Sequence, residues 1–204
     1  MKQGTLKGFL AAYKKYNPTY DHYDRYIDEA ISHLFKKYPG HKSIEQVFAK
    51  ISLVNRVYRT NVERRKKEAE WKLAELLVAN KFDNIIAPLK RIQKFNSETL
   101  PEIVKVHTRF VTLSKKTIRI RATSFCSKYL HFHFPKLIPI FDSNAYETAW
   151  RLVRKEICTS CGDIGDYEYF CLAILALAEK LRSQRIRSPN LKTIDYLLYD
   201  KLRK

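Results

Sequence analysis

The chain has 204 residues, of which 39 are Lys or Arg and 21 are Asp or Glu, so its formal net charge is +18. Hydrophobic residues make up 45% of it, which is enough apolar mass for a core and excludes a disordered basic tail. The longest apolar run, Phe170 to Ala178, has nine residues and is too short to cross a bilayer. With only five glycines, the chain also lacks the composition of Rossmann or P-loop phosphate sites. We therefore expect one compact domain over residues 1–204, with a polyanion, nucleic acid first, as its partner.

The first half of the chain shows the apolar spacing of amphipathic helices. Pro39 and Gly40 are expected to end the first of these helices, and Ser43 to cap the second. The predicted helices cover residues 27–38, 44–58 and 68–79, with a short helix bounded by Pro88 and by Asn96-Ser97.

The second half continues the helical pattern, interrupted once by an extended crossing. Pro135 and Pro139 predict that crossing, which reads PKLIPIF, and Asp142 or Ser143 is expected to begin the helix after it. Ser188-Pro189 is expected to cap and open the last helix. The other predicted helices cover residues 98–113, 116–131, 142–157 and 167–181. Strand-like runs are too few for a substantial sheet, so the predicted class is all-α, as one body or as two helical lobes with a cleft.

The positive charge is concentrated in one region. No acidic residue occurs between Glu102 and Asp142, and that interval contains eight bases. Two smaller basic clusters are Arg64 to Lys67 and the C-terminal tail from Lys180. Phosphate contacts from such a surface release counterions, so we expect nucleic-acid binding with a steep dependence on salt.

Cysteine and histidine give weak metal signals. Cys158 and Cys161 have CxxC spacing but lack further ligands nearby, and Cys171 lies in an apolar helix where it is typical of a core residue. His131 and His133 are two residues apart, so they do not share a helix face. We therefore predict no metal and no cofactor.

The most informative segment runs from Arg121 to Trp150. It places Lys128 on an apolar and aromatic helix, and then, after the crossing, Asp142 at the start of a helix. A carboxylate there can cap the helix, pair with a basic surface, or stabilise a cationic transition state.

This order of Ser-Lys, apolar helix, Pro-Ile-Phe-Asp crossing and following helix resembles the helix-hairpin-helix DNA glycosylases, closest to their 8-oxoguanine glycosylase-like branch and its small prokaryotic relatives. The segments SKYLHFHFPKLIPIFDS and LVNRVYRT carry the resemblance. By resemblance, Lys128 corresponds to the hairpin lysine and Asp142 to the catalytic aspartate. The chain departs from the family in that residues 123–127 contain no glycine and in a Lys-to-Asp interval of only 14 residues.

The resemblance implies an enzyme that binds double-stranded DNA as a monomer, flips out a damaged or modified base and cleaves its N-glycosidic bond. Attack by Lys128 through a Schiff base would add lyase activity. Such an enzyme would act in DNA repair or in defence against modified invading DNA. The expected DNA contacts are Lys115, Lys116, Arg119, Arg121, Ser124, Ser127 and Arg151, and the expected base pocket is Asn55, Tyr58, His131 and His133.

Simpler interpretations of the same residues stay open. Asp142 alone is an ordinary helix cap, Lys128 an ordinary phosphate contact, and Asn55 an ordinary surface residue. The competing functions are a non-catalytic basic DNA-binding protein and a protein-interaction domain. Since the N-terminus lacks a long apolar run, we expect no secretory signal and a cytoplasmic protein that is nucleoid-associated when bound to DNA.

Overall fold

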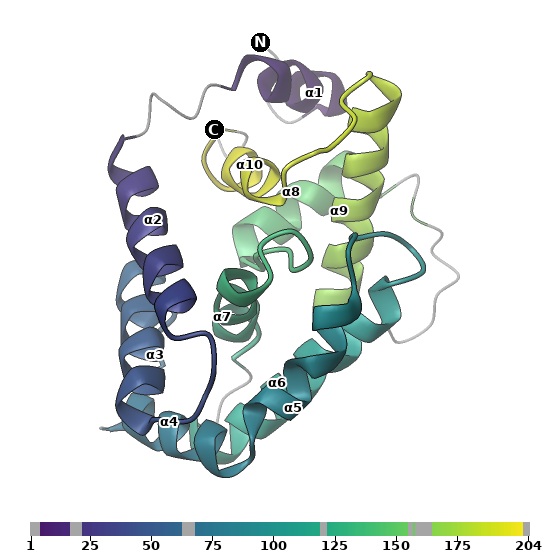
Figure 1. Ribbon diagram of the computed structural model, residues 1–204. Helices are drawn as coiled ribbons and strands as arrows, with labels where there is room; N and C mark the ends of the chain where they lie inside the picture. The colour runs from purple at the N-terminus through teal and green to yellow at the C-terminus, as the bar shows by residue number, and fades with distance from the viewer. Residues whose placement is uncertain are drawn as a thin grey trace.

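The computed structural model describes residues 5–16, 22–62, 68–118, 122–154, 157 and 165–201. Over these ranges all regular secondary structure is helical, which confirms the predicted all-α class (Figure 1). None of the helices in these ranges is long and apolar enough to span a membrane.

The helices follow one another with short connections. The first half contains α1 (Leu6–Lys15), α2 (His22–Lys37), α3 (Ile44–Tyr58), α4 (Ala69–Ala79), α5 (Phe82–Ile86) and the 3-10 helix η2 (Ala87–Arg91). The second half contains α6 (Leu100–Ile118), α7 (Thr123–His133), α8 (Ser143–Val153), α9 (Asp166–Ser183), α10 (Leu191–Tyr196) and the π-helix η3 (Leu197–Lys201).

Two predicted helix starts are confirmed by their caps. The hydroxyl of Ser43 accepts the backbone N–H of Gln46 at 3.3 Å and begins α3. The carboxylate of Asp142 accepts the N–H of Asn144 at 3.0 Å and begins α8. In both cases a short polar side chain satisfies a backbone donor that has no partner within the helix.

Three predicted boundaries are wrong. The helix expected from Lys116 does not begin there, because α6 continues to Ile118, and Ser114, Thr117 and Ile118 extend its buried face. Pro88 does not bound a helix but lies within η2, near its start, where a missing N–H costs little.

The third wrong boundary is the start of the last helix. Ser188 was expected as its cap, but Asn190 performs this function, since its Oδ1 accepts the N–H of Thr193 at 3.0 Å. The hydroxyl of Tyr13, on α1, in turn accepts the N–H of Asn190 at 2.7 Å. The N-terminal helix thus helps to fix where α10 begins, a contact that no local sequence pattern reports.

Helix α7 lies in the interior of the molecule. Helices α2 and α3 pack against it on one side and α6 on another, while α8 packs against α9 (Figure 1). The core is one continuous apolar cluster that extends from Phe9 on α1 to Leu198 on η3. Because the core residues of α7 belong to this cluster, every functional group on that helix has a fixed position.

A buried polar network lies beside α7, around His41. The Nδ1 of His41 donates to the Asp83 carboxylate at 2.8 Å, so its Nε2 accepts the hydroxyl of Tyr129 at 3.0 Å. Burial lowers the pKa of His41 to about 4. The ring of His133 lies 4.9 Å from that of His41, and its buried Nε2 has no hydrogen-bond partner among the described residues.

We predict that acid destabilises the protein through these histidines. Burial lowers the pKa of His41 and of His131 to about 4, and that of His133 well below its usual value of 6.5. The unfolded chain therefore binds more protons than the folded one below pH 6.5, so the free energy of unfolding falls as the pH drops towards 4.

Replacement His133→Phe tests this prediction, because Phe fits an apolar aromatic site and binds no proton. Between pH 6.5 and 5 the variant should lose less stability than the wild type, by up to about 1.4 kcal/mol per pH unit. Urea denaturation at a series of pH values measures the difference, with His33→Phe on the exposed face of α2 as the control. Parallel curves for wild type and His133→Phe would contradict the prediction.

Candidate active site

The structure brings together the two residues that the sequence analysis singled out for chemistry. The Nζ of Lys128, on α7, lies 3.6 Å from the Oδ2 of Asp142, at the start of α8. The Lys128 side chain is only 5% exposed, whereas that of Asp142 is 24% exposed. A buried amine therefore faces a carboxylate that retains some contact with solvent.

Two serines on the first turns of α7 set this geometry. The hydroxyl of Ser124 accepts a hydrogen bond from Lys128 Nζ at 2.8 Å. The hydroxyl of Ser127 donates to the carbonyl of Ser124 at 2.9 Å and accepts the N–H of Phe141, also at 2.9 Å. Ser127 thus joins α7 to Phe141, the residue before Asp142. The end of the extended crossing is therefore in contact with α7.

The two oxygens of the Asp142 carboxylate have different partners. Oδ1 accepts the N–H of Asn144 and caps α8, while Oδ2 faces Lys128. Capping and pairing are therefore compatible, so the simple N-cap interpretation of Asp142 is correct without excluding a chemical function.

Helices α2, α3 and α10 complete the site with further charged groups. The hydroxyl of Tyr58 donates to Asp28 Oδ1 at 2.6 Å and accepts from Lys192 Nζ at 2.7 Å. Lys192 Nζ also lies 3.1 Å from Asp28 Oδ2 and 3.8 Å from Asp195 Oδ2. The resulting group, which we call the lysine–aspartate cluster, consists of Asp28, Tyr58, Lys128, Asp142, Lys192 and Asp195.

Both lysines of the cluster approach the ring of Tyr58. The Nζ atoms of Lys128 and Lys192 lie 5.5 Å and 5.0 Å from its centroid, within the range of cation–π attraction. Two ammonium groups thus lie near one aromatic ring, and the carboxylates of Asp28, Asp142 and Asp195 offset their charge.

Burial shifts the proton affinities in the cluster. Burial lowers the pKa of Lys128 below its usual value, against the opposing effect of the Asp142 and Asp195 charges. Burial also raises the pKa of Asp195 to about 6, although Lys192 and Lys128 act in the other direction. An amine whose proton is more easily removed, placed beside a carboxylate, is a combination suited to nucleophilic chemistry.

Of the four residues predicted to line a base pocket, only Tyr58 joins the cluster through a direct contact. Asn55 instead bonds to Glu70 through its amide nitrogen and accepts the N–H of Val62 at 3.0 Å, which closes the end of α3. His131 is buried, and its Nδ1 donates to the carbonyl of Ile138 at 2.7 Å. The fourth, His133, lies beside His41, as described above.

The predicted DNA contacts divide into exposed and buried residues. Lys115 and Lys116 on α6 and Arg151 on α8 are exposed, as contact with a phosphate backbone requires. Ser127 is fully buried and both of its hydrogen bonds are internal, so we replace its predicted DNA contact with a structural function. Ser124 is half-buried and bonds to Lys128. Arg119 and Arg121 lie outside the described residues.

The structure gives no support to a metal site. Among the described residues no group of three or more His, Cys, Asp or Glu side chains could hold a metal ion. Cys171 is buried in α9, which confirms its prediction as a core residue, and Cys126 is buried in α7. Burial raises the pKa of the Cys126 thiol to about 12, which makes it unreactive. Cys158 and Cys161 lie outside the described residues.

Comparison with known proteins gives one match. The model of the HI_0787_N family, described as an N-terminal domain, matches residues 8–137, which is more than half of the chain. The chain belongs to the HI_0787_N family. No curated protein and no solved structure matches the chain. The HI_0787_N description names no activity and no link to the glycosylases, so the resemblance to those enzymes stays a prediction.

The HI_0787_N match divides the lysine–aspartate cluster. Lys128 and Tyr58 lie within the matched residues, whereas Asp142, Lys192 and Asp195 follow them in the chain. Helices α8 and α10 therefore contribute charged groups to a site whose central lysine lies in the matched domain.

Sequence reasoning missed three members of the cluster: Asp28, Lys192 and Asp195. Lys192 and Asp195 are three residues apart on one side of α10, which is a pattern that also occurs on many solvated helices. Asp28 lies 164 positions before Lys192, so nothing local in the sequence indicates their contact.

The replacement Tyr58→Phe should destabilise the protein by about 1–3 kcal/mol, because it removes a hydroxyl that bonds to two charged groups. Urea denaturation at pH 7 measures the change in the free energy of unfolding. As the control, Tyr199→Phe removes a hydroxyl from a side chain that is 48% exposed, and it should change stability by less than about 0.5 kcal/mol. Equal effects at the two positions would contradict this account of the cluster.

Proposed function

We propose that the protein is a DNA N-glycosylase in which Lys128 acts as the nucleophile and Asp142 as the carboxylate that stabilises positive charge on the sugar. The observation that carries this proposal is the 3.6 Å approach of the buried Lys128 amine to the Asp142 carboxylate. The substrate is a damaged or modified base, and the biological context is repair or defence against modified invading DNA.

The proposed reaction begins with loss of a proton from the Lys128 ammonium, which burial makes easier. The free amine attacks the C1′ carbon of the flipped nucleotide, and the bond between C1′ and the base breaks, so the base leaves with the bonding electrons and takes up a proton. Asp142 stabilises the positive charge that develops on the sugar. Opening of the sugar ring yields an imine between C1′ and Nζ, from which elimination of the 3′ phosphate cleaves the strand.

Double-stranded DNA is the proposed partner because the charge distribution suits a phosphate backbone. The chain carries a net charge of +18, and residues 103–141 contain no acid. Lys115, Lys116 and Arg151 are exposed on two helices of the described structure. Such a protein would act on cytoplasmic DNA, and we propose that it does so as a monomer.

Access to Lys128 places a further condition on the proposal. The side chain is 5% exposed, and the Nζ of Lys192 on α10 approaches the same tyrosine ring. We therefore propose that side chains of the cluster rearrange when a sugar reaches Nζ.

Borohydride trapping tests the proposed nucleophile. Incubation with duplexes that carry oxidised, deaminated, alkylated or abasic sites, in the presence of borohydride, should reduce the imine to a stable protein–DNA adduct. The replacement Lys128→Gln should abolish the adduct, whereas Lys36→Gln, at an exposed position of α2, should retain it. An adduct that survives Lys128→Gln would rule out Lys128 as the nucleophile.

The replacement Asp142→Asn tests the carboxylate separately from the helix cap, because Asn also caps helices well. Excision should fall by about 100-fold or more, as expected for loss of a charge that acts in the transition state. Stability should also fall, because the buried Lys128 amine loses its opposite charge while the cap is kept. Single-turnover excision and urea denaturation measure the two effects. Unchanged excision would show that Asp142 only caps α8.

The alternative function is DNA binding without cutting, and the same experiments decide between the two. This alternative predicts tight, salt-dependent binding to the duplexes with neither released base nor trapped adduct on any of them. A shallow salt dependence together with weak binding would instead favour a protein-interaction domain.

A further inference from the structure

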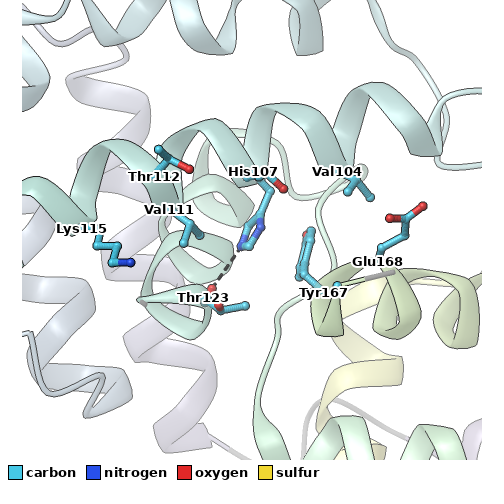
Figure 2. Close-up of a pocket in the computed structure, with 10 residues that line it drawn as sticks. Val104, His107, Val111, Thr112, Lys115, Thr123, Tyr167 and Glu168 are labelled. Atoms are coloured by element: carbon cyan, nitrogen blue, oxygen red, sulfur yellow. Dashed lines mark hydrogen bonds between the residues drawn. The ribbon is translucent and has the colours of Figure 1, made fainter. Parts of the chain in front are cut away.

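A cavity lies at the start of α7, apart from the lysine–aspartate cluster. The cavity, of about 420 Å³, opens between α6, the first residue of α7 and the first turn of α9 (Figure 2). Neither Lys128 nor Asp142 lines it. Its size is within the usual range for sites that bind small molecules.

One face of α6 forms the long wall of this cavity. The lining positions on α6, from Val104 to Lys115, are spaced by three and four residues, and so lie along one stripe of the helix. At 1.5 Å per residue, the stripe is about 16 Å long. The cavity is therefore an elongated groove, with Lys115 at one end and Glu168 of α9 near the other (Figure 2).

The middle of the groove is rigid. The rings of His107 and Tyr167 are stacked, with centroids 3.6 Å apart and an interplanar angle of 18°. His107 Nε2 donates to the carbonyl of Thr123 at 3.1 Å, and the hydroxyl of Tyr167 donates to the carbonyl of Pro139 at 3.2 Å. Both rings are buried, so the groove keeps its shape without a ligand.

Four polar side chains along the groove have no hydrogen-bond or ion-pair partner in the described part of the protein. The side chains of Lys115 and Glu168 form no hydrogen bond or ion pair with any described residue, and the hydroxyls of Thr108 and Thr112 likewise have no partner there. The groove thus presents a cation with hydroxyls at one end and a carboxylate at the other. A ligand that satisfies both ends must carry an anion and, several ångströms away, a hydrogen-bond donor.

We propose that this groove binds one nucleotide, with its phosphate at Lys115 and Thr112 and an amino group of its base at Glu168. Lysine and hydroxyl groups bind phosphate oxygens, and a glutamate accepts hydrogen bonds from the exocyclic amino group of cytosine. The nucleotide is either free or part of a DNA strand, since both present the same groups. This inference goes beyond base excision and requires no reaction at Lys128.

Calorimetric titration with dCMP and dUMP tests the inference, because position 4 of the base carries an amino group in dCMP and a carbonyl oxygen in dUMP, with the accompanying change at N3 from acceptor to donor. The protein should bind dCMP at least about tenfold more tightly than dUMP. The replacement Glu168→Gln should reduce this preference, whereas Glu147→Gln on the exposed face of α8 should leave it unchanged. Equal affinity of the wild type for both nucleotides would overturn the assignment of Glu168.

The phosphate end has a closely matched control in the neighbouring lysine. Both Lys115 and Lys116 are exposed, but only Lys115 lines the groove. The replacement Lys115→Met should weaken binding of both nucleotides by about tenfold, and Lys116→Met by much less. Equal losses for the two variants would show general electrostatic attraction and overturn the site.

A third experiment distinguishes a free nucleotide from a nucleotide within a DNA strand as the ligand. Short single-stranded oligonucleotides, with cytosine or uracil at one position, are titrated into the same variants and into Lys128→Gln. If only the oligonucleotides bind, and Lys115→Met weakens them selectively, the ligand is a nucleotide within a strand. Binding that Lys128→Gln leaves intact supports the groove even where excision fails, whereas binding of neither free nor strand nucleotides overturns it.

Discussion

The ammonium group of Lys128 imposes the constraint on which the candidate site depends. A charged amine in the interior costs several kcal/mol unless nearby charges and hydrogen bonds compensate. Here Asp142 supplies the opposite charge, Ser124 an acceptor and Tyr58 an aromatic face. The residue at the start of α8 therefore has two functions, since it caps the helix and balances a cation. An aspartate can do both, because one carboxylate oxygen accepts the backbone N–H and the other faces the amine.

Helix α7 serves three environments with different parts of its surface. Lys128 faces the lysine–aspartate cluster, Thr123 lines the groove beside α6, and Tyr129 reaches the buried network around His41. A central helix surrounded by other helices can do this because its side chains point in every direction around the axis. The apolar core around it fixes all three sites relative to one another.

The sequence indicated features that lie within one segment of the chain, but it did not indicate contacts between distant segments. Lys128 and Asp142 were singled out together because the segment around them resembles the glycosylases, and the two prolines between them predicted the extended crossing. The contribution of α10 could not be predicted, because Lys192 meets Asp28 only through packing of segments far apart in the chain. The same reason explains why Asn190 was missed as a cap, since Tyr13 of α1 helps to place it. The presence of most helices was predictable from apolar spacing. Some helix ends, however, depended on contacts between segments far apart in the chain.

The double hydrogen bond of Ser127 has a consequence for how the molecule divides its tasks. By joining α7 to Phe141, this hydroxyl makes residues 124–142 a self-contained unit in which amine and carboxylate stay in register. Two further charged groups of the cluster, Lys192 and Asp195, come instead from α10. The paired groups and part of the charge around them are thereby encoded in separate segments. Substitutions in α10 can change the charge around the amine while the amine and the carboxylate keep their alignment.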